Sequence, residues 1–322
     1  MSLCIAVLAW ATPIAAQHHQ HHAHPSQDTR ASIELRDNTG VGVLTVRVGP
    51  LKMPPRTEHM SPPLTPIRVP FDAWYVAYEP RLVDKDGNPR PGHLLHHVEL
   101  LNLNRRNFLC PLQPERMFAA GSELSDWPRL PGVGYRVTQE QRIIVAVMFH
   151  NPTDEEVSNA YLEVHIHYVL PGTSRLTNIY PAWFLVTHCG ATIYDLPPGL
   201  HVKGSELVVP HSGKLLGVGG HIHDYGRQLR LENTTRKEHI ATLDISLRED
   251  GRLRSIPVVV FPSPGGYRIG ADDAIKATAV YDNPTGRPLP KAAMGIVVGY
   301  FVPDHDEELA ALTRDPTSLW RR

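Results

Sequence analysis

A His-x-His pair stands in the stretch 219–226, which reads Gly-Gly-His-Ile-His-Asp-Tyr-Gly and contains His221 and His223. Apolar residues precede the pair and alternating residues follow it, a pattern that predicts one β-strand passing through the motif. Side chains two residues apart share a face of a strand, so both imidazoles would point the same way and could hold one metal ion. The alternative is a pair of surface histidines on a polar strand face.

Three more histidines stand in or at the end of predicted strands. His96 and His97 are neighbours in the strand 94–103, and His150 ends the apolar strand 143–150. Adjacent residues of a regular strand face opposite ways. His96 and His97 can therefore share a metal only if the strand twists or bulges, or if the rings bind through different nitrogens. His150 is either an exposed strand end or a ligand aimed across the sheet.

A methionine, Met294, lies in the predicted strand 292–300. Methionine usually fills space in a core. If Met294 lies across from His221 and His223, its thioether completes a set of two nitrogens and one sulfur. Soft sulfur favours copper, above all Cu(I), over zinc or magnesium.

A second His-x-His pair, His165 and His167, falls in the strand 161–170. This strand alternates cleanly, with its apolar residues expected to face the core and both histidines on the polar face. We interpret them as solvent-facing residues and not as metal ligands.

The length and composition of the chain limit the possible folds and the possible binding partners. The chain has 322 residues, more than one ordinary domain needs and enough for two. Its 32 basic and 33 acidic side chains nearly balance, which argues against nucleic acid or an anionic membrane as a partner. Thirty prolines and 24 glycines separate short apolar runs, and helical periodicity is weak. These features predict an all-β protein of two tandem antiparallel β-sandwiches.

The first 30 residues and the cysteines indicate where the protein is located in or outside the cell. Residues 1–16 form an apolar run that ends in small residues, as in a signal peptide, which predicts a secreted or periplasmic protein with no stable membrane association. No basic residue precedes the run, so an upstream start stays open. Residues 17–30 are a histidine-rich segment that can build no core. Cys110 and Cys189 either pair or are each small buried residues.

The ordered set of motifs resembles the copper type II, ascorbate-dependent monooxygenases, the family of peptidylglycine α-hydroxylating monooxygenase and dopamine β-monooxygenase. The resemblance covers roughly residues 31–303. It rests on the paired histidines, the segment 128–137, the lone histidine that ends a strand, the Pro-Pro-Gly of 197–199, the His-x-His pair and the methionine.

The family resemblance implies two jelly-roll-like sandwiches that face each other across a cleft, an N-terminal copper domain of 31–176 and a C-terminal one of 177–311, followed by the tail 312–322. It further implies two copper ions per chain. The site that stores an electron would be held by His96, His97 and His150. The site where dioxygen and substrate meet would be held by His221, His223 and Met294, which makes these three the catalytic residues.

The resemblance implies that the chain hydroxylates an activated C–H bond of a small substrate with O2 and a reductant such as ascorbate. In the peptide-amidating members an arginine two residues before the His-x-His pair holds the substrate carboxylate. Gly219 stands at that position here, which argues against peptide amidation. The alternative function is a secreted copper-binding or carrier protein without hydroxylase activity. A zinc hydrolase fits less well, because the chain lacks a His-Glu-x-x-His motif and a hydrolytic zinc site needs no thioether.

Overall fold

The computed structural model describes residues 31–62, 66–121, 127–262 and 265–314. The expected signal peptide and histidine-rich segment lie outside these ranges, as do residues 315–322 of the expected tail. Within the described ranges the chain is all-β, with 23 strands and a single α-helix of five residues, α1 (Asp306–Ala310). No helix in these ranges is long and apolar enough to cross a membrane.

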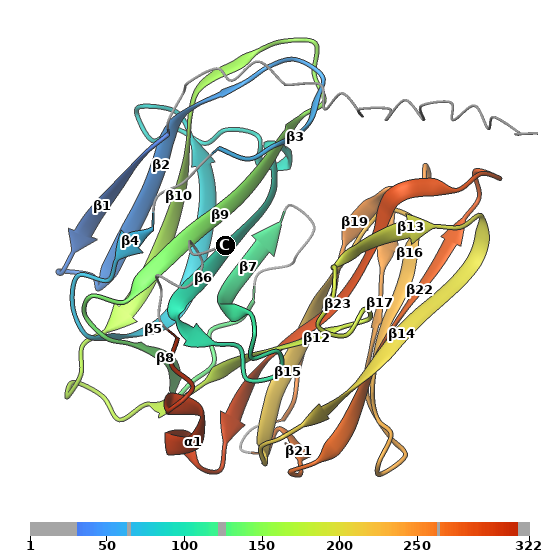
Figure 1. Ribbon diagram of the computed structural model, residues 1–322. Coiled ribbons are helices and arrows are strands. Elements are labelled where there is room, and N and C mark those ends of the chain that lie inside the picture. Colours follow the sequence, from blue (N-terminus) through green and yellow to red (C-terminus); the bar gives the residue numbers. More distant parts are fainter. Residues whose placement is uncertain (1–30, 63–65, 122–126, 263–264, 315–322) are drawn as a thin grey trace, which may run out of the picture.

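Two sheets packed face to face form the first sandwich, which is coloured blue to green in Figure 1. Apart from the parallel pair of β8 and β11, the pairings are antiparallel. The outer sheet has the order β1 (Ser32–Asn38), β2 (Val43–Met53), β10 (Val157–Val169), β5 (Ala73–Val83), β8 (Val133–Val137) and β11 (Thr177–Asn178). The sheet nearer the second sandwich has the order β3 (Thr57–Met60), β9 (Arg142–Asn151), β6 (Leu95–Arg106) and β7 (Pro114–Gly121), with β4 (Ile67–Arg68) also on β9.

The second sandwich is also antiparallel and is coloured yellow to red (Figure 1). The sheet nearer the first sandwich has the order β12 (Tyr180–Leu185), β23 (Leu289–Pro303), β15 (Gly213–Ile222) and β20 (Val259–Val260), with β13 (Ile193–Leu196) on β23 and β21 (Tyr267–Ile269) on β15. The far sheet has the order β14 (Gly199–Val209), β22 (Asp273–Asn283), β16 (Gly226–Asn233) and β17 (Glu238–Asp244). A small pair, β18 (Ser246–Leu247) and β19 (Leu253–Ser255), completes the set.

Alternation along the strands explains why these residues form sandwiches. In β10 the side chains of Leu162, Val164 and Ile166 are almost fully buried, while the residues between them lie on the outer face. The buried apolar residues of the protein fall into two large clusters. Ile179 belongs to the first cluster and Tyr180 to the second, so the chain passes from one core to the other between them.

The two sandwiches are in direct contact. Tyr300 and Val302, on β23 of the second sandwich, pack against the core of the first. Phe108, which follows β6, is buried in the core of the second. A disulfide also joins Cys110 to Cys189, which settles the alternatives left open by the sequence in favour of pairing.

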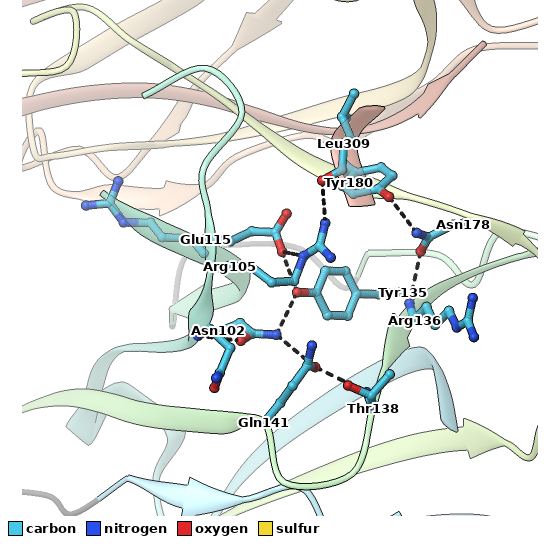
Figure 2. A network of polar contacts seen from close by, with 12 residues as sticks. Asn102, Arg105, Glu115, Tyr135, Arg136, Thr138, Gln141, Asn178, Tyr180 and Leu309 are labelled. Carbon is cyan, nitrogen blue, oxygen red and sulfur yellow. Dashed lines mark hydrogen bonds and ion pairs between the residues drawn. The ribbon is translucent and has the colours of Figure 1, made fainter. Parts of the chain in front are cut away.

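A buried polar network reinforces this junction, and Figure 2 shows it from close by. Arg105 on β6 forms an ion pair with Glu115 on β7 and donates a hydrogen bond to the carbonyl of Leu309 in α1, at 3.1 Å. Its guanidinium also lies over the ring of Tyr180. Tyr135 donates a hydrogen bond to Glu115. The first sandwich is thus tied to the start and to the end of the second.

Both sandwiches use the same buried asparagine at the end of a central strand. Asn151 ends β9 and Asn283 ends β22, and each begins an Asn-Pro-Thr sequence. Each side-chain amide donates hydrogen bonds to three backbone carbonyls. Each side-chain oxygen accepts from the threonine two residues on, Thr153 or Thr285. A shared corner of this kind indicates that the two sandwiches are built to one plan.

Candidate metal centre

The structure brings the five histidines of the two expected ligand sets into one cluster between the sandwiches. Within the first set, the ring centroids are 5.1 Å apart for His96–His97 and 5.9 Å for His96–His150. Within the second set, those of His221 and His223 are 5.1 Å apart. Between the sets, the distances are 6.1 Å for His96–His223 and 6.3 Å for His97–His221. An imidazole nitrogen binds a metal at ~2 Å, so two imidazoles on one ion have ring centres roughly 4.5–6.5 Å apart. The pairs within each expected set fall in this window, and so do the pairs His96–His223 and His97–His221 between the sets, so the two sets lie directly side by side.

The first set depends on an irregularity in β6. The pairing of β6 with β9 shifts its register between Leu95 and His97. This shift is the bulge that adjacent histidines need if they are to approach a common point. His150 enters from the end of β9, the central neighbour of β6, and all three rings are partly buried.

The second set lies on a turn, which corrects the prediction of one continuous strand through 219–226. β15 ends at Ile222, and β16, which begins at Gly226, belongs to the other sheet of the sandwich. Tyr225 has a positive φ of 66°, and the N–H of Gly226 donates to the carbonyl of His223 at 3.1 Å. A Cβ at position 226 would lie 2.5 Å from Ile222, so glycine is required there. His223 therefore stands at a corner between two sheets.

Met294 lies on β23, the strand that pairs with β15. The register places Ile222 opposite Gly295, and one further step would place His223 opposite Met294. Met294 is 8% exposed and belongs to a small apolar cluster with Trp183, Leu185 and Ile296 of its own sheet, against which Ala119 of the first sandwich packs.

Tyr281, on β22, holds the backbones of His223 and Met294 together. Its hydroxyl accepts hydrogen bonds from the N–H of His223 at 3.1 Å and of Met294 at 3.0 Å, and it donates to the Met294 carbonyl. Burial raises the pKa of the Tyr281 hydroxyl, which keeps it protonated and able to donate. Its role could not be predicted from the sequence, since a tyrosine in an alternating strand carries no spacing signal.

The five rings lie close together without forming a ready-made metal site. No three His, Cys, Asp or Glu side chains of the described ranges are already arranged to hold one metal ion.

His59 is a further histidine of the cluster, and its place there was not predicted from the sequence. It lies on β3, whose pairing with β9 places it near His96, with ring centroids 5.4 Å apart. Its side chain is exposed. A single histidine has no partner spacing from which a site can be inferred.

The second His-x-His pair lies away from this cluster, on the outer face of β10. Nε2 of His165 is 3.1 Å from a carboxylate oxygen of Glu163, and Nε2 of His167 is 3.0 Å from one of Glu79 on the neighbouring strand β5. These contacts belong to a row of polar side chains on the outer sheet.

A cavity of about 280 Å³ opens beside the histidines, between the facing sheets of the two sandwiches. His97 from the first sandwich and His221 and Met294 from the second line it together. Most of the remaining wall is apolar or aromatic, and Trp127 and Tyr300 contribute large rings. The cavity therefore joins members of both expected ligand sets to a space suited to a small apolar molecule.

Comparisons with known proteins add little to this geometry. No protein-family model matches the chain, and no curated protein matches it. Among solved structures, the STIV MCP matches with 9% identity and a TM-score of 0.32 over 88% of this chain and 99% of its own. An f-lectin (fucolectin) from Morone saxatilis (striped bass) serum matches with 8% identity and a TM-score of 0.19, over 81% and 82%. Neither similarity is close enough to carry an argument about this protein.

Proposed function

We propose that this chain is a secreted copper-dependent monooxygenase that hydroxylates an activated C–H bond of a small substrate, with O2 and a one-electron reductant such as ascorbate. One observation carries the proposal. Members of both expected ligand sets, His97 on one side and His221 with Met294 on the other, line a single apolar cavity between the sandwiches.

The donor set fits copper. Imidazoles bind copper in both oxidation states, and a thioether adds affinity for Cu(I). His96, His97 and His150 would hold one ion, with His59 close enough to His96 to supply a further nitrogen. His221, His223 and Met294 would hold the other. When bound, copper would supply the one-electron chemistry that lets O2 react with a C–H bond.

The residues of the chain would position the ligands and the substrate and would keep water out. Tyr281 fixes the backbone on both sides of the second set. The apolar walls of the cavity would hold a substrate next to the ligands and keep bulk water out, which limits side reactions. Gly219 leaves no side chain for a substrate carboxylate at that position, and the ring of Trp127 lies against it. This arrangement supports a substrate other than a peptide with a free carboxylate.

The disulfide supports the proposed location. Cys110 and Cys189 form a bond that persists in oxidising compartments and is rare in the cytosol.

The cavity also favours the enzyme over the alternative function of a copper carrier. A protein that only binds or delivers copper needs the histidines but has no use for an apolar space beside them. The carrier function nonetheless defines the control in the test that follows.

Copper loading followed by oxygen uptake tests the proposal. The loaded protein should consume O2 with ascorbate in proportion to product formed from a panel of benzylic and amide compounds, and ¹⁸O from labelled O2 should enter the product. The His221→Ala variant should lose this coupled activity. Copper binding with ascorbate oxidation that yields no hydroxylated product from the panel would favour the carrier.

A further inference from the structure

Strand β7 meets the cavity with its edge and not with one face. Its last residues, Ala119, Ala120 and Gly121, all line the cavity, although neighbouring side chains of a strand point to opposite faces. Ala119 packs on the apolar cluster around Trp183 in the second sandwich, whereas Ala120 packs on the core of its own sandwich. A cavity that touches residues of both faces lies along the edge of the strand.

That edge has no neighbouring strand among the described residues. β7 is the last strand of its sheet, on the side of the second sandwich (Figure 1), so alternate residues point their backbone N–H and C=O groups away from β6. Gly121 is partly exposed and has only backbone atoms, so backbone of β7 forms part of the cavity surface. The indole N–H of Trp183 donates to the carbonyl of Arg116 at 3.2 Å, which shows that a group from outside the sheet reaches a backbone acceptor of β7.

Arg116 and Glu99 also line the cavity, and they compensate each other's charge. Nε of Arg116 is 3.5 Å from a carboxylate oxygen of Glu99, and both side chains are mostly buried. The guanidinium also lies over the ring of Trp183, 5.2 Å from its centroid. Because each charge already has a counter-charge, a charged ligand would have to compete with this pair, whereas a neutral ligand would not.

The second sandwich contributes an apolar wall to the same cavity. β12 and β23 present Trp183, Ile296 and Val298 to it, and these side chains come from one face of their sheet. An aromatic ring gains free energy by burying its apolar surface against such a wall. The cavity therefore combines an apolar side with a backbone edge that offers hydrogen bonds.

We propose that the cavity accepts a neutral molecule of about one aromatic ring that carries a secondary amide, and that the amide pairs with the free edge of β7 as a further strand would. A secondary amide has the N–H donor and the C=O acceptor of a peptide unit, which match the acceptors and donors of an open strand edge. Gly121 pairs with His97, so a molecule on this edge lies beside a proposed copper ligand. A volume of about 280 Å³ suits a molecule of that size. As a statement about the substrate, this inference rests on the proposed function, but as a statement about binding it stands without copper.

Three probes of similar size test the amide: N-benzylacetamide, benzyl acetate and 3-phenylpropanoate. Dissociation constants are measured by calorimetry on the copper-free and the copper-loaded protein. The ester keeps the carbonyl but lacks the N–H. N-benzylacetamide should therefore bind roughly fivefold to tenfold more tightly than benzyl acetate, the worth of one hydrogen bond. It should also bind more tightly than the carboxylate.

Two proline variants locate the edge. Neighbouring residues of a strand point their N–H groups to opposite sides, so one of Ala119 and Ala120 donates toward β6 and the other lies on the free edge. Proline removes the N–H, so one of Ala119→Pro and Ala120→Pro should lower the denaturation midpoint strongly. The other should stay folded by circular dichroism and bind N-benzylacetamide about fivefold more weakly. Valine at that second position keeps the N–H and should retain most of the affinity.

Hydrogen exchange gives a test that needs no variant. Saturating N-benzylacetamide should slow the exchange of backbone amides in 118–121. The edge strand β14 of the second sandwich, none of whose residues line the cavity, is the control and should exchange at an unchanged rate.

Four results would overturn the inference. Equal binding of N-benzylacetamide and benzyl acetate would remove the amide, and tighter binding of the carboxylate would make Arg116 the anchor. Unchanged exchange in 118–121 with the amide bound would remove the edge of β7, and absence of binding by all three probes would remove the cavity. If N-benzylacetamide binds as expected and no hydroxylated product forms from any compound of the panel, the proposed function fails and the binding preference stands.

Discussion

The hydroxyl of Tyr281 is hydrogen-bonded twice to the backbone of Met294. The Met294 N–H donates to the hydroxyl at 3.0 Å, and the hydroxyl donates to the Met294 carbonyl. The same hydroxyl receives the N–H of His223. One side chain thereby sets the distance between a proposed nitrogen ligand and a proposed sulfur ligand that are distant in sequence.

Tyr281→Phe should therefore loosen the second set without removing a ligand. Two backbone N–H groups lose this acceptor in a buried position, so we expect a loss of about 2–4 kcal/mol in the free energy of unfolding. Copper titration should show weaker binding of one ion and unchanged binding of the other. Tyr267→Phe, which removes a hydroxyl bound to Glu238 at an exposed site, is the control and should cost under about 1 kcal/mol. Equal losses in the two variants would contradict a positioning role.

Met294→Ile tests the thioether. The two side chains have similar bulk, so the fold and most of the copper should be retained. Hydroxylation driven by ascorbate should fall by at least about tenfold, equivalent to about 1.4 kcal/mol of barrier. X-ray absorption of the reduced protein should show copper–sulfur scattering in the wild type and none in the variant. Normal turnover in Met294→Ile would make this residue a core filler.

The double variant His165→Ala, His167→Ala should leave copper binding intact. Both rings lie on the outer face of β10 against carboxylates, at partly exposed sites where such pairs are worth up to about 1 kcal/mol each. We expect full copper content by elemental analysis and a small decrease in the denaturation midpoint. Loss of one copper equivalent would show that the ligands had been assigned to the wrong histidines.

Deletion of residues 17–30 should leave about two copper ions per folded chain, because the two proposed sets both lie outside that segment. Equilibrium dialysis followed by elemental analysis measures the ratio. His96→Ala and His221→Ala, each in the truncated protein, should each reduce the ratio to about one. A truncated protein that binds one ion or none would exclude two sites.

Arg105→Met should destabilise the protein by about 3–5 kcal/mol at neutral pH, since Glu115 is then left charged in a fully buried position. Burial raises the pKa of the Glu115 carboxyl even with Arg105 in place. A raised pKa in the folded state favours the protonated form, so the deficit should be smaller below the ordinary carboxyl pKa and grow as pH rises through the raised value. Chemical denaturation at pH 4 and pH 7 measures the difference, and the double variant with Glu115→Gln should recover much of the loss.

Much of the fold could be predicted from sequence, because a half-buried strand records its environment in alternation. β10 is the clearest case, with Leu162, Val164 and Ile166 on one face and polar residues on the other. The turn at His223 was not predictable in the same way. Apolar residues precede the pair and alternation begins after Gly226, as in one strand, and the positive φ falls on Tyr225, a residue type that gives no turn signal.

The composition of the metal centre was only partly predictable. Spacing along a strand relates neighbours such as His221 and His223, but the approach of His96 to His223 depends on how two sandwiches dock. The same limit explains why His59 was missed. The Asn-Pro-Thr repeat at Asn151 and Asn283 can be read from the sequence, but only the structure shows that both copies make the same hydrogen bonds.

The disulfide has a mechanical consequence for the metal centre. It fastens Cys110, just after β6, to Cys189, near the start of the second sandwich, 79 residues further along the chain. The backbone at Ile179–Tyr180 is a second covalent attachment. With two covalent attachments, the bonds of the chain allow the sandwiches to rotate only about the line through them, and the buried contacts at the junction oppose that remaining rotation. Reduction of the disulfide removes one attachment, so that the backbone and these buried contacts alone hold the two halves of the metal centre in register.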